Sequence, residues 1–115
     1  MRKVALFAFN GELMCFIHVL LNALDMQEKG FDVKIVLEGS ATKLIPELAA
    51  KESPMFSLYE KVKTLGLIDG VCKACSNKMG TLDAIKNEGI TLLDEMSGHP
   101  SMGRYQAEGF TVITF

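Results

Sequence analysis

Two cysteines separated by two residues, Cys72 and Cys75, are the residues of this sequence best suited to chemistry. They stand where an apolar, strand-like segment passes into a helical one, and the start of a helix favours the thiolate form of cysteine. Lys73 lies between them and adds positive charge. A thiolate attacks disulfides, persulfides and other activated sulfur. The motif therefore predicts nucleophilic or sulfur-carrying chemistry, with an exposed and electrostatically favoured sulfur at Cys72.

A packing role for these cysteines stays open, because a buried cysteine behaves as a small hydrophobic residue. Cys15 is expected in the core, since it stands between Met14 and Phe16 in an apolar helical stretch. The chain has three cysteines. An odd number argues against a disulfide framework and for reduced thiols.

We expect no metal and no other cofactor. One C-x-x-C pair supplies only half of the ligands of a structural zinc site, and the sequence has no second pair. The further candidates, Cys15, His18 and His99, are single residues without ligand spacing. A thioredoxin-type oxidoreductase is disfavoured as well, because its C-x-x-C normally follows the first strand of the domain.

The chain alternates segments of strand and helix character. Apolar runs that end at turn residues predict strands at residues 4–9, 31–37, 70–74, 90–93 and 110–115. Apolar residues at helical spacing predict helices at 12–29, 75–79, 82–88 and 102–108, with Asn10 capping the first. A broken helical stretch covers 40–66, where Pro46 and Pro54 interrupt the pattern and Ser53 is the expected cap of its second part.

This alternation predicts an α/β fold, specifically a three-layer α/β/α sandwich around a mainly parallel sheet of about five strands. No linker, internal repeat or low-complexity segment divides the 115 residues, so we expect a single domain over 1–115. The last predicted strand is a candidate edge strand that another subunit could cover, which favours a homo-oligomer.

Ligands of such sheets bind beyond the carboxyl ends of the strands, where loops enter helices. The loops that follow the first three predicted strands should meet there, and so should the glycine- and proline-bounded loop before the last helix. The candidate binding residues in these loops are Asn10, Gly11, Gly39, Ser76, Asn77 and His99.

Composition excludes several kinds of function. The net charge is −2, so no basic surplus is available to drive nucleic-acid binding. The apolar stretch around residues 13–24 is interrupted by His18 and Asn22 and is too short for a bilayer span. No secretory signal is convincing, because the basic start leads directly into a strand-like run. We therefore expect a cytoplasmic protein without membrane contact.

At the third-strand cysteines the chain resembles the DsrE/DsrF-like family, small α/β proteins of sulfur relay. The resemblance covers the element order of nearly the whole domain, and its most specific part is the segment from Val71 to Gly80. Cys72 stands at the position of the family's sulfur-accepting cysteine and Cys75 at that of a second thiol found in some members. Gly80 matches the glycine that closes the short helix.

The resemblance implies a sulfurtransferase or persulfide carrier. Cys72 would accept a sulfane sulfur, Cys75 would assist or resolve, and Lys73 would stabilise the thiolate. The partners would be sulfur donor and acceptor proteins or small sulfur compounds, and the assembly a trimer or hexamer. The alternative is a non-enzymatic, oligomeric module of the same fold that binds a small ligand or partner and whose cysteines only pack.

Overall fold

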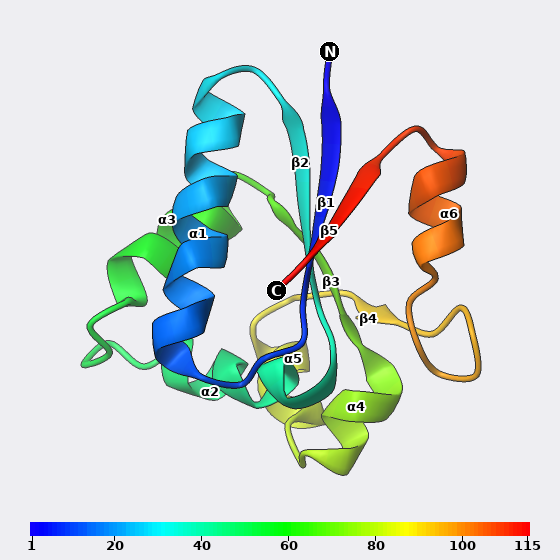
Figure 1. Cartoon of the computed structure of the whole chain (residues 1–115). Helices are drawn as coiled ribbons and strands as arrows, with labels where there is room; N and C mark the ends of the chain where they lie inside the picture. Colours follow the sequence, from blue (N-terminus) through cyan, green and yellow to red (C-terminus); the bar gives the residue numbers. More distant parts are fainter.

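The computed structural model describes residues 1–115 and contains one five-stranded sheet of order β4-β3-β2-β1-β5 (Figure 1). Every neighbouring pair of strands is parallel. The strands are β1 (Lys3–Ala8), β2 (Asp32–Leu37), β3 (Ile68–Cys72), β4 (Leu92–Leu93) and β5 (Thr111–Thr114). The predicted α/β class with a parallel sheet of about five strands is confirmed.

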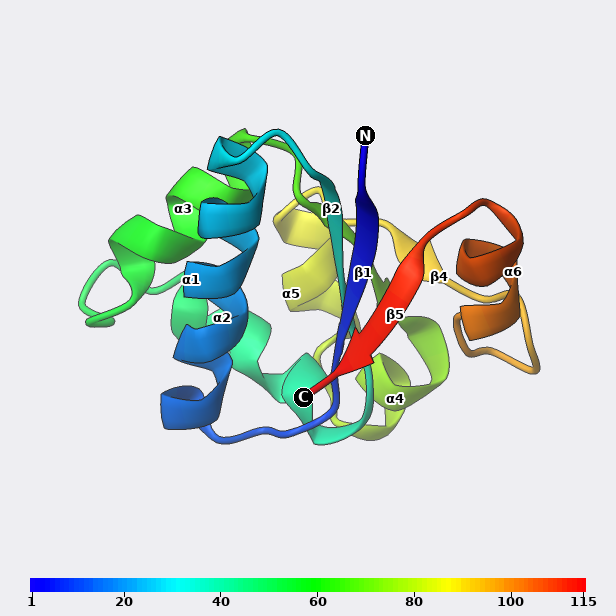
Figure 2. The same ribbon diagram turned by 45° about the horizontal axis from the view of Figure 1, so that its top comes forward.

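Helices connect the strands and cover the sheet on both faces. They are α1 (Leu13–Glu28), the 3-10 helix η1 (Gly39–Lys43), α2 (Leu44–Leu48), α3 (Phe56–Thr64), α4 (Lys73–Lys78), α5 (Leu82–Asn87) and α6 (Met102–Ala107). The two views show α1 and α3 together on one face, α6 on the other, and α4 near the end of the sheet to which the strand arrows point (Figures 1 and 2). The three layers of the predicted sandwich follow from this arrangement.

The core has two parts, one on each face of the sheet. Val4, Leu6 and Ala8 of β1 join a cluster of 20 buried residues that includes apolar side chains of α1, α2 and α3. On the opposite face, Phe7 packs edge-on against Tyr105 of α6 at a ring-centroid distance of 5.3 Å, within a cluster of six buried residues. Burial on both faces explains why β1 is a nearly continuous apolar run.

β4 is only two residues long and packs very closely on β3. A Cβ atom at Gly70 of β3 would lie 2.5 Å from Cγ of Leu93, so only glycine leaves room for that side chain. This close contact fixes the position from which the chain leaves β4.

The broken helical stretch is divided differently from the prediction. Pro46 is the third residue of α2, within the first turn, where an N–H group has no intrahelical partner and its absence costs nothing. α3 begins at Phe56, two residues later than expected, because Met55 and not Ser53 is its N-cap. Ser53 accepts a hydrogen bond from the Met55 backbone N–H at 3.2 Å.

The expectation that Cys15 belongs to the core is wrong. Cys15 is exposed on α1, whereas the next residue, Phe16, is buried. Successive residues of a helix point about 100° apart, so an apolar neighbour in the sequence does not place a residue on the buried face. None of the helices is long and apolar enough to cross a bilayer.

Candidate functional site

Four side chains from three loops converge beyond the carboxyl ends of neighbouring strands. Glu38 follows β2, Cys72 ends β3, Cys75 lies in the first turn of α4, and His99 lies in the loop after β4. The His99 Nδ1 atom is 3.1 Å from the Cys72 Sγ atom, 3.9 Å from the Cys75 Sγ atom and 4.0 Å from the Glu38 Oε1 atom. The two sulfur atoms and one carboxylate oxygen thus lie within 4.0 Å of the same imidazole nitrogen.

Cys72 was predicted to carry an exposed, stabilised thiolate, but its exposure and the pKa of its thiol both differ from that prediction. Its exposed fraction is 0%. Burial raises the pKa of its thiol to about 12; a hydrogen bond from the Cys75 backbone N–H opposes this shift, while the Cys75 thiol and the Glu38 carboxylate add to it. The expected exposed and stabilised thiolate at Cys72 is therefore wrong, because desolvation outweighs the favourable end of the short helix α4.

Cys75 is the accessible sulfur of the pair, since it is partly exposed. The Cys75 backbone N–H donates a hydrogen bond to the Cys72 Sγ atom at 3.4 Å. The first turn of α4 therefore holds the buried Cys72 sulfur in place. Lys73 is exposed, and its ammonium group pairs with Asp94 at 3.4 Å. Its positive charge is thus directed toward a carboxylate on the loop after β4.

His99 is positioned by a tight hairpin. Ser97 and Gly98 both have positive φ angles, 51° and 89°, which is the conformation of a two-residue type I′ turn. Met96 and His99 pair across this turn through two backbone hydrogen bonds of 2.8 and 3.0 Å. The turn at Ser97 and Gly98 therefore fixes the backbone position of His99, from which the imidazole extends.

Gly98 docks this hairpin on α4. Its carbonyl oxygen accepts a hydrogen bond from the Ala74 backbone N–H at 2.9 Å and lies 3.6 Å from the Cys72 thiol. A Cβ atom at Gly98 would lie 3.0 Å from the Ala74 Cβ atom. The hairpin can approach the cysteines this closely only with glycine at its tip.

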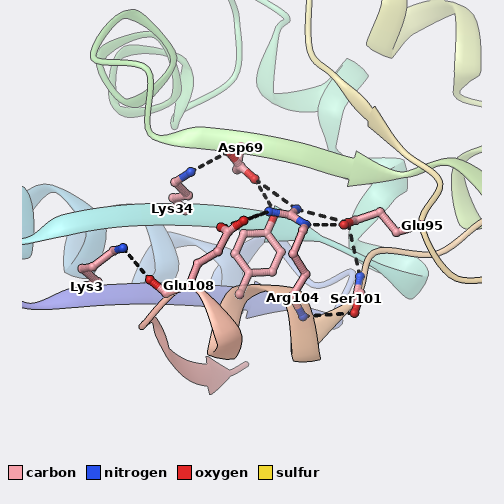
Figure 3. A network of polar contacts seen from close by, with 8 residues as sticks. Lys3, Lys34, Asp69, Glu95, Ser101, Arg104 and Glu108 are labelled. Atoms are coloured by element: carbon pink, nitrogen blue, oxygen red, sulfur yellow. Dashed lines mark hydrogen bonds and ion pairs between the residues drawn. The ribbon is translucent and has the colours of Figure 1, made fainter.

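An ionic network anchors the base of the hairpin on α6 (Figure 3). Arg104 contacts both oxygens of the Glu95 carboxylate through Nε and Nη2, and lies 3.9 Å from Asp69 of β3. The hydrogen bonds from Arg104 lower the pKa of Glu95. Ser101 caps α6 by accepting a hydrogen bond from the Arg104 backbone N–H. The loop that carries His99 is thus held at its tip by α4 and at its base by α6.

The remaining predicted binding residues lie at the same end of the sheet but have local roles. The Asn10 side chain accepts a hydrogen bond from the Glu12 backbone N–H at 2.8 Å and does not cap α1, whose N-cap is Glu12. The Gly11 N–H donates to the Ser40 hydroxyl at 3.0 Å, which ties the loops after β1 and β2 together. Gly39 begins η1 with a positive φ of 55°.

Ser76 and Asn77 of α4 differ in burial and in role. Ser76 is buried, and its hydroxyl donates to the Cys72 carbonyl oxygen at 2.6 Å, so it fastens the helix to the end of β3. Asn77 is exposed and lines an open cleft of about 370 Å³ together with Lys73, Asp94 and Gly98. Neither Cys72 nor Cys75 lines this cleft. A larger cleft of about 550 Å³ lies near the chain start, around Lys3 and Phe31.

Glu38 is the residue of the cluster that was not among the predicted site residues. It is only 8% exposed, and burial raises the pKa of its carboxyl group, which the charge of His99 opposes. Its carboxylate has no hydrogen-bond partner in the chain. The signal that could have found it is its position directly after a buried strand, at the edge where the cysteine loop was expected.

These features define a parallel α/β protein with a dithiol and an imidazole at the carboxyl end of its sheet. No family model matches the sequence. The chain is 35% identical over 96 residues to the uncharacterized protein MJ0733 of Methanocaldococcus jannaschii, which covers 84% of this chain and 76% of that protein. The chain therefore belongs to the family of that protein.

Two further proteins are similar to this chain. An uncharacterized protein of Archaeoglobus fulgidus is 36% identical over 59 residues, which are 51% of this chain and 95% of that protein. The structure of BT1422 from Bacteroides thetaiotaomicron, a conserved protein of unknown function, superposes with a TM-score of 0.69 over 98% of this chain and 95% of the other, at 18% identity. At that identity the likeness shows the fold alone.

Proposed function

We propose that this protein is a cytoplasmic sulfur-relay protein in which a cysteine pair accepts sulfane sulfur and passes it to a partner thiol. The observation that carries the proposal is that the Cys72 and Cys75 sulfurs lie 3.1 and 3.9 Å from the same imidazole nitrogen. The resemblance of the cysteine segment to the DsrE/DsrF-like family supports it, as do three free thiols, which suit a reducing compartment.

In this proposal Cys75 is the receiving thiol, because a donor can reach it and cannot reach Cys72. The Cys75 thiolate attacks the outer sulfur of a donor persulfide, and the donor's S–S bond breaks. The donor leaves as a thiolate and takes the proton that His99 removed from Cys75. An acceptor thiolate then attacks the outer sulfur of the Cys75 persulfide, and Cys75 leaves as a thiolate. The two steps balance without net oxidation.

Cys72 provides a competing outcome. If it attacks the inner sulfur of the Cys75 persulfide, a Cys72–Cys75 disulfide forms and hydrosulfide leaves. The two thiols are then oxidised by two electrons and the sulfane sulfur is reduced. A homo-oligomer, trimeric or hexameric, is part of the proposal, because the edge strand β5 is largely exposed in the single chain.

Mass spectrometry after exposure of the reduced protein to a small-molecule persulfide tests the proposal. We expect an added sulfur atom on Cys75, absent in Cys75→Ser and longer-lived in Cys72→Ser, which lacks the resolving thiol. Cys15→Ser is the matched control and should behave as the unmodified protein. No adduct with any donor, or an adduct on Cys15 alone, would contradict the proposal.

The burial of Cys72 favours a second candidate, a non-enzymatic module that binds a small ligand or partner through the cleft lined by Asn77, Lys73 and Asp94. In that case the cysteines only pack. The two candidates differ in the Cys75→Ser variant, which would keep the function of a binding module and abolish that of a sulfur relay.

A further inference from the structure

We infer that Cys72, Cys75 and His99 form a binding site for a single zinc ion, and that Glu38 supplies its fourth ligand by turning toward the two sulfurs. Cys72, Cys75 and His99 each offer one ligand atom, and these atoms lie within 4.8 Å of one another. Glu38 adds a carboxylate oxygen 4.0 Å from the His99 Nδ1 atom. This inference does not depend on the proposed sulfur relay.

The spacing of the donor atoms fits one tetrahedral ion. Bonds of about 2.3 Å to sulfur and about 2.0–2.1 Å to nitrogen place the donors of a tetrahedral zinc ion roughly 3.5–3.8 Å apart. The distances from the His99 Nδ1 atom to the donors of Cys72, Cys75 and Glu38 are 3.1, 3.9 and 4.0 Å. Shifts of a few tenths of an ångström would bring these three distances to that value. The Glu38 carboxylate lies outside the group of ligand atoms within 4.8 Å of one another, so it would also have to turn closer to the two sulfurs.

The arrangement around the imidazole is that of ligands and differs from that of a catalytic triad. In a nucleophile–histidine–acid triad the carboxylate contacts the ring nitrogen opposite the one that faces the nucleophile. Here Glu38, Cys72 and Cys75 all face Nδ1. Two sulfurs and one nitrogen within 4.8 Å of one another are donors that a cation between them can use.

The surroundings of Glu38 are a second reason to expect a cation at this place. Its side chain is 11% exposed and accepts no hydrogen bond within the chain, and its charged neighbour is His99, 4.0 Å away. A buried carboxylate without a partner is costly, and buried charges in proteins are usually paired or bound to metals. A zinc ion bound to the two sulfurs would supply the partner.

The donor set selects the kind of metal. Two thiolates and an imidazole favour zinc over magnesium or calcium, which prefer oxygen ligands. Spacing in the sequence does not predict this site, since His99 stands 24 residues after Cys75 and comes from a different loop. In the zinc-bound form both sulfurs are ligands, which lowers their reactivity toward a donor persulfide.

Cobalt and zinc titrations of the reduced, chelator-treated full chain test the site. We expect one Co²⁺ per chain, with the visible bands of a tetrahedral ion and a thiolate charge-transfer band, all of which disappear when Zn²⁺ is added. Cys75→Ser and His99→Asn should each weaken zinc binding by about 100-fold or more, and Glu38→Gln by about tenfold. Cys15→Ser, which removes a cysteine outside the site, should leave the affinity unchanged.

The variants can be judged independently of folding. Cys75 and His99 are partly exposed, so their metal-free variants should unfold at nearly the same temperature as the metal-free parent. Zinc should raise that temperature for the parent only. Absence of a cobalt spectrum, or zinc affinity that survives Cys75→Ser and His99→Asn, would overturn the site. Unchanged affinity in Glu38→Gln would overturn the fourth ligand.

The sulfur-adduct experiment is run separately on metal-free and zinc-loaded protein. Zinc binding without any adduct on the metal-free chain would refute the sulfur relay and leave the metal site standing. An adduct on a chain that binds no zinc would refute the metal site and leave the relay standing. If both hold, zinc should suppress adduct formation.

Discussion

His99 Nδ1 lies 3.1 Å from Cys72 Sγ, although 27 residues separate the two along the chain. This contact depends on a hydrogen bond and an ion pair formed by other residues of the same loop. The Gly98 carbonyl oxygen accepts a hydrogen bond from the Ala74 N–H, and the Glu95 carboxylate forms an ion pair with Arg104. Variants that weaken these connections should therefore change the site without removing any of its sulfur or nitrogen atoms.

Replacing Gly98 with alanine should destabilise the fold by about 1–3 kcal/mol, because a Cβ is strained at its φ of 89° and meets Ala74 at 3.0 Å. Urea unfolding measures this loss. The displaced imidazole should also weaken zinc binding. Gly103→Ala is the matched control, since its Cβ would have open space in α6 and only Ser101 Oγ nearby at 3.6 Å. It should be neutral or up to about 1 kcal/mol more stable.

The three cysteines should react with iodoacetamide in a fixed order. Cys15 is exposed, Cys75 is partly exposed and Cys72 is buried, with a pKa of about 12. Peptide mass spectrometry should find Cys15 and Cys75 labelled near pH 8 while Cys72 stays unmodified until the pH approaches its pKa or the protein unfolds. Rapid labelling of Cys72 at neutral pH would contradict the burial described above.

Removing the Arg104–Glu95 pair should lower stability at neutral pH but not in acid. The pKa of Glu95 is lowered in the fold, so its stabilising contribution is present above its ordinary value of 4.5 and is lost as the pH falls through the folded value. Glu95→Gln should cost about 0.5–1 kcal/mol at pH 7. Urea unfolding near pH 7 and in acid compares the two conditions, and an equal loss in both would exclude the ionic explanation.

Tyr59→Phe should destabilise the protein by about 1–2 kcal/mol, because the hydroxyl of the buried Tyr59 donates to Glu88 at 2.6 Å. Burial raises the pKa of Glu88, but the hydrogen bonds from Tyr59 and Lys63 more than offset it and lower the value. Thermal unfolding of Tyr59→Phe, Glu88→Gln and the double variant measures the coupling. If the two single losses simply add, the hydrogen bond makes no contribution of its own.

Local patterns were sufficient to predict most of the fold. The apolar run of β1 and the helical spacing of α1 are patterns formed by residues close together in the sequence. The alternation of such segments predicts the parallel sheet. Pro46 misled the prediction because a proline is harmless in a first turn, a position that the pattern did not reveal. The two-residue strand β4 was overestimated, since its pairing depends on Gly70 making room for Leu93.

The site was only partly predictable, because its geometry depends on contacts between distant loops. The C-x-x-C pair and His99 were identified as candidates from their types and positions. The burial of Cys72 was not predicted, since nothing in the motif shows that Gly98 would lie 3.6 Å from its sulfur. Glu38 was missed for the same reason, as a single acidic residue after a strand has no distinguishing pattern.

The type I′ turn at Ser97 and Gly98 makes the site sensitive to the length of this loop as well as to the glycine at its tip. A hairpin side chain alternates between faces, so one inserted residue before His99 would turn the imidazole away from the cysteines. Relatives with a longer loop at this position should therefore lack the four-residue cluster even where both cysteines are retained. The length of this loop is thus a simple criterion for recognising which sequences carry the same site.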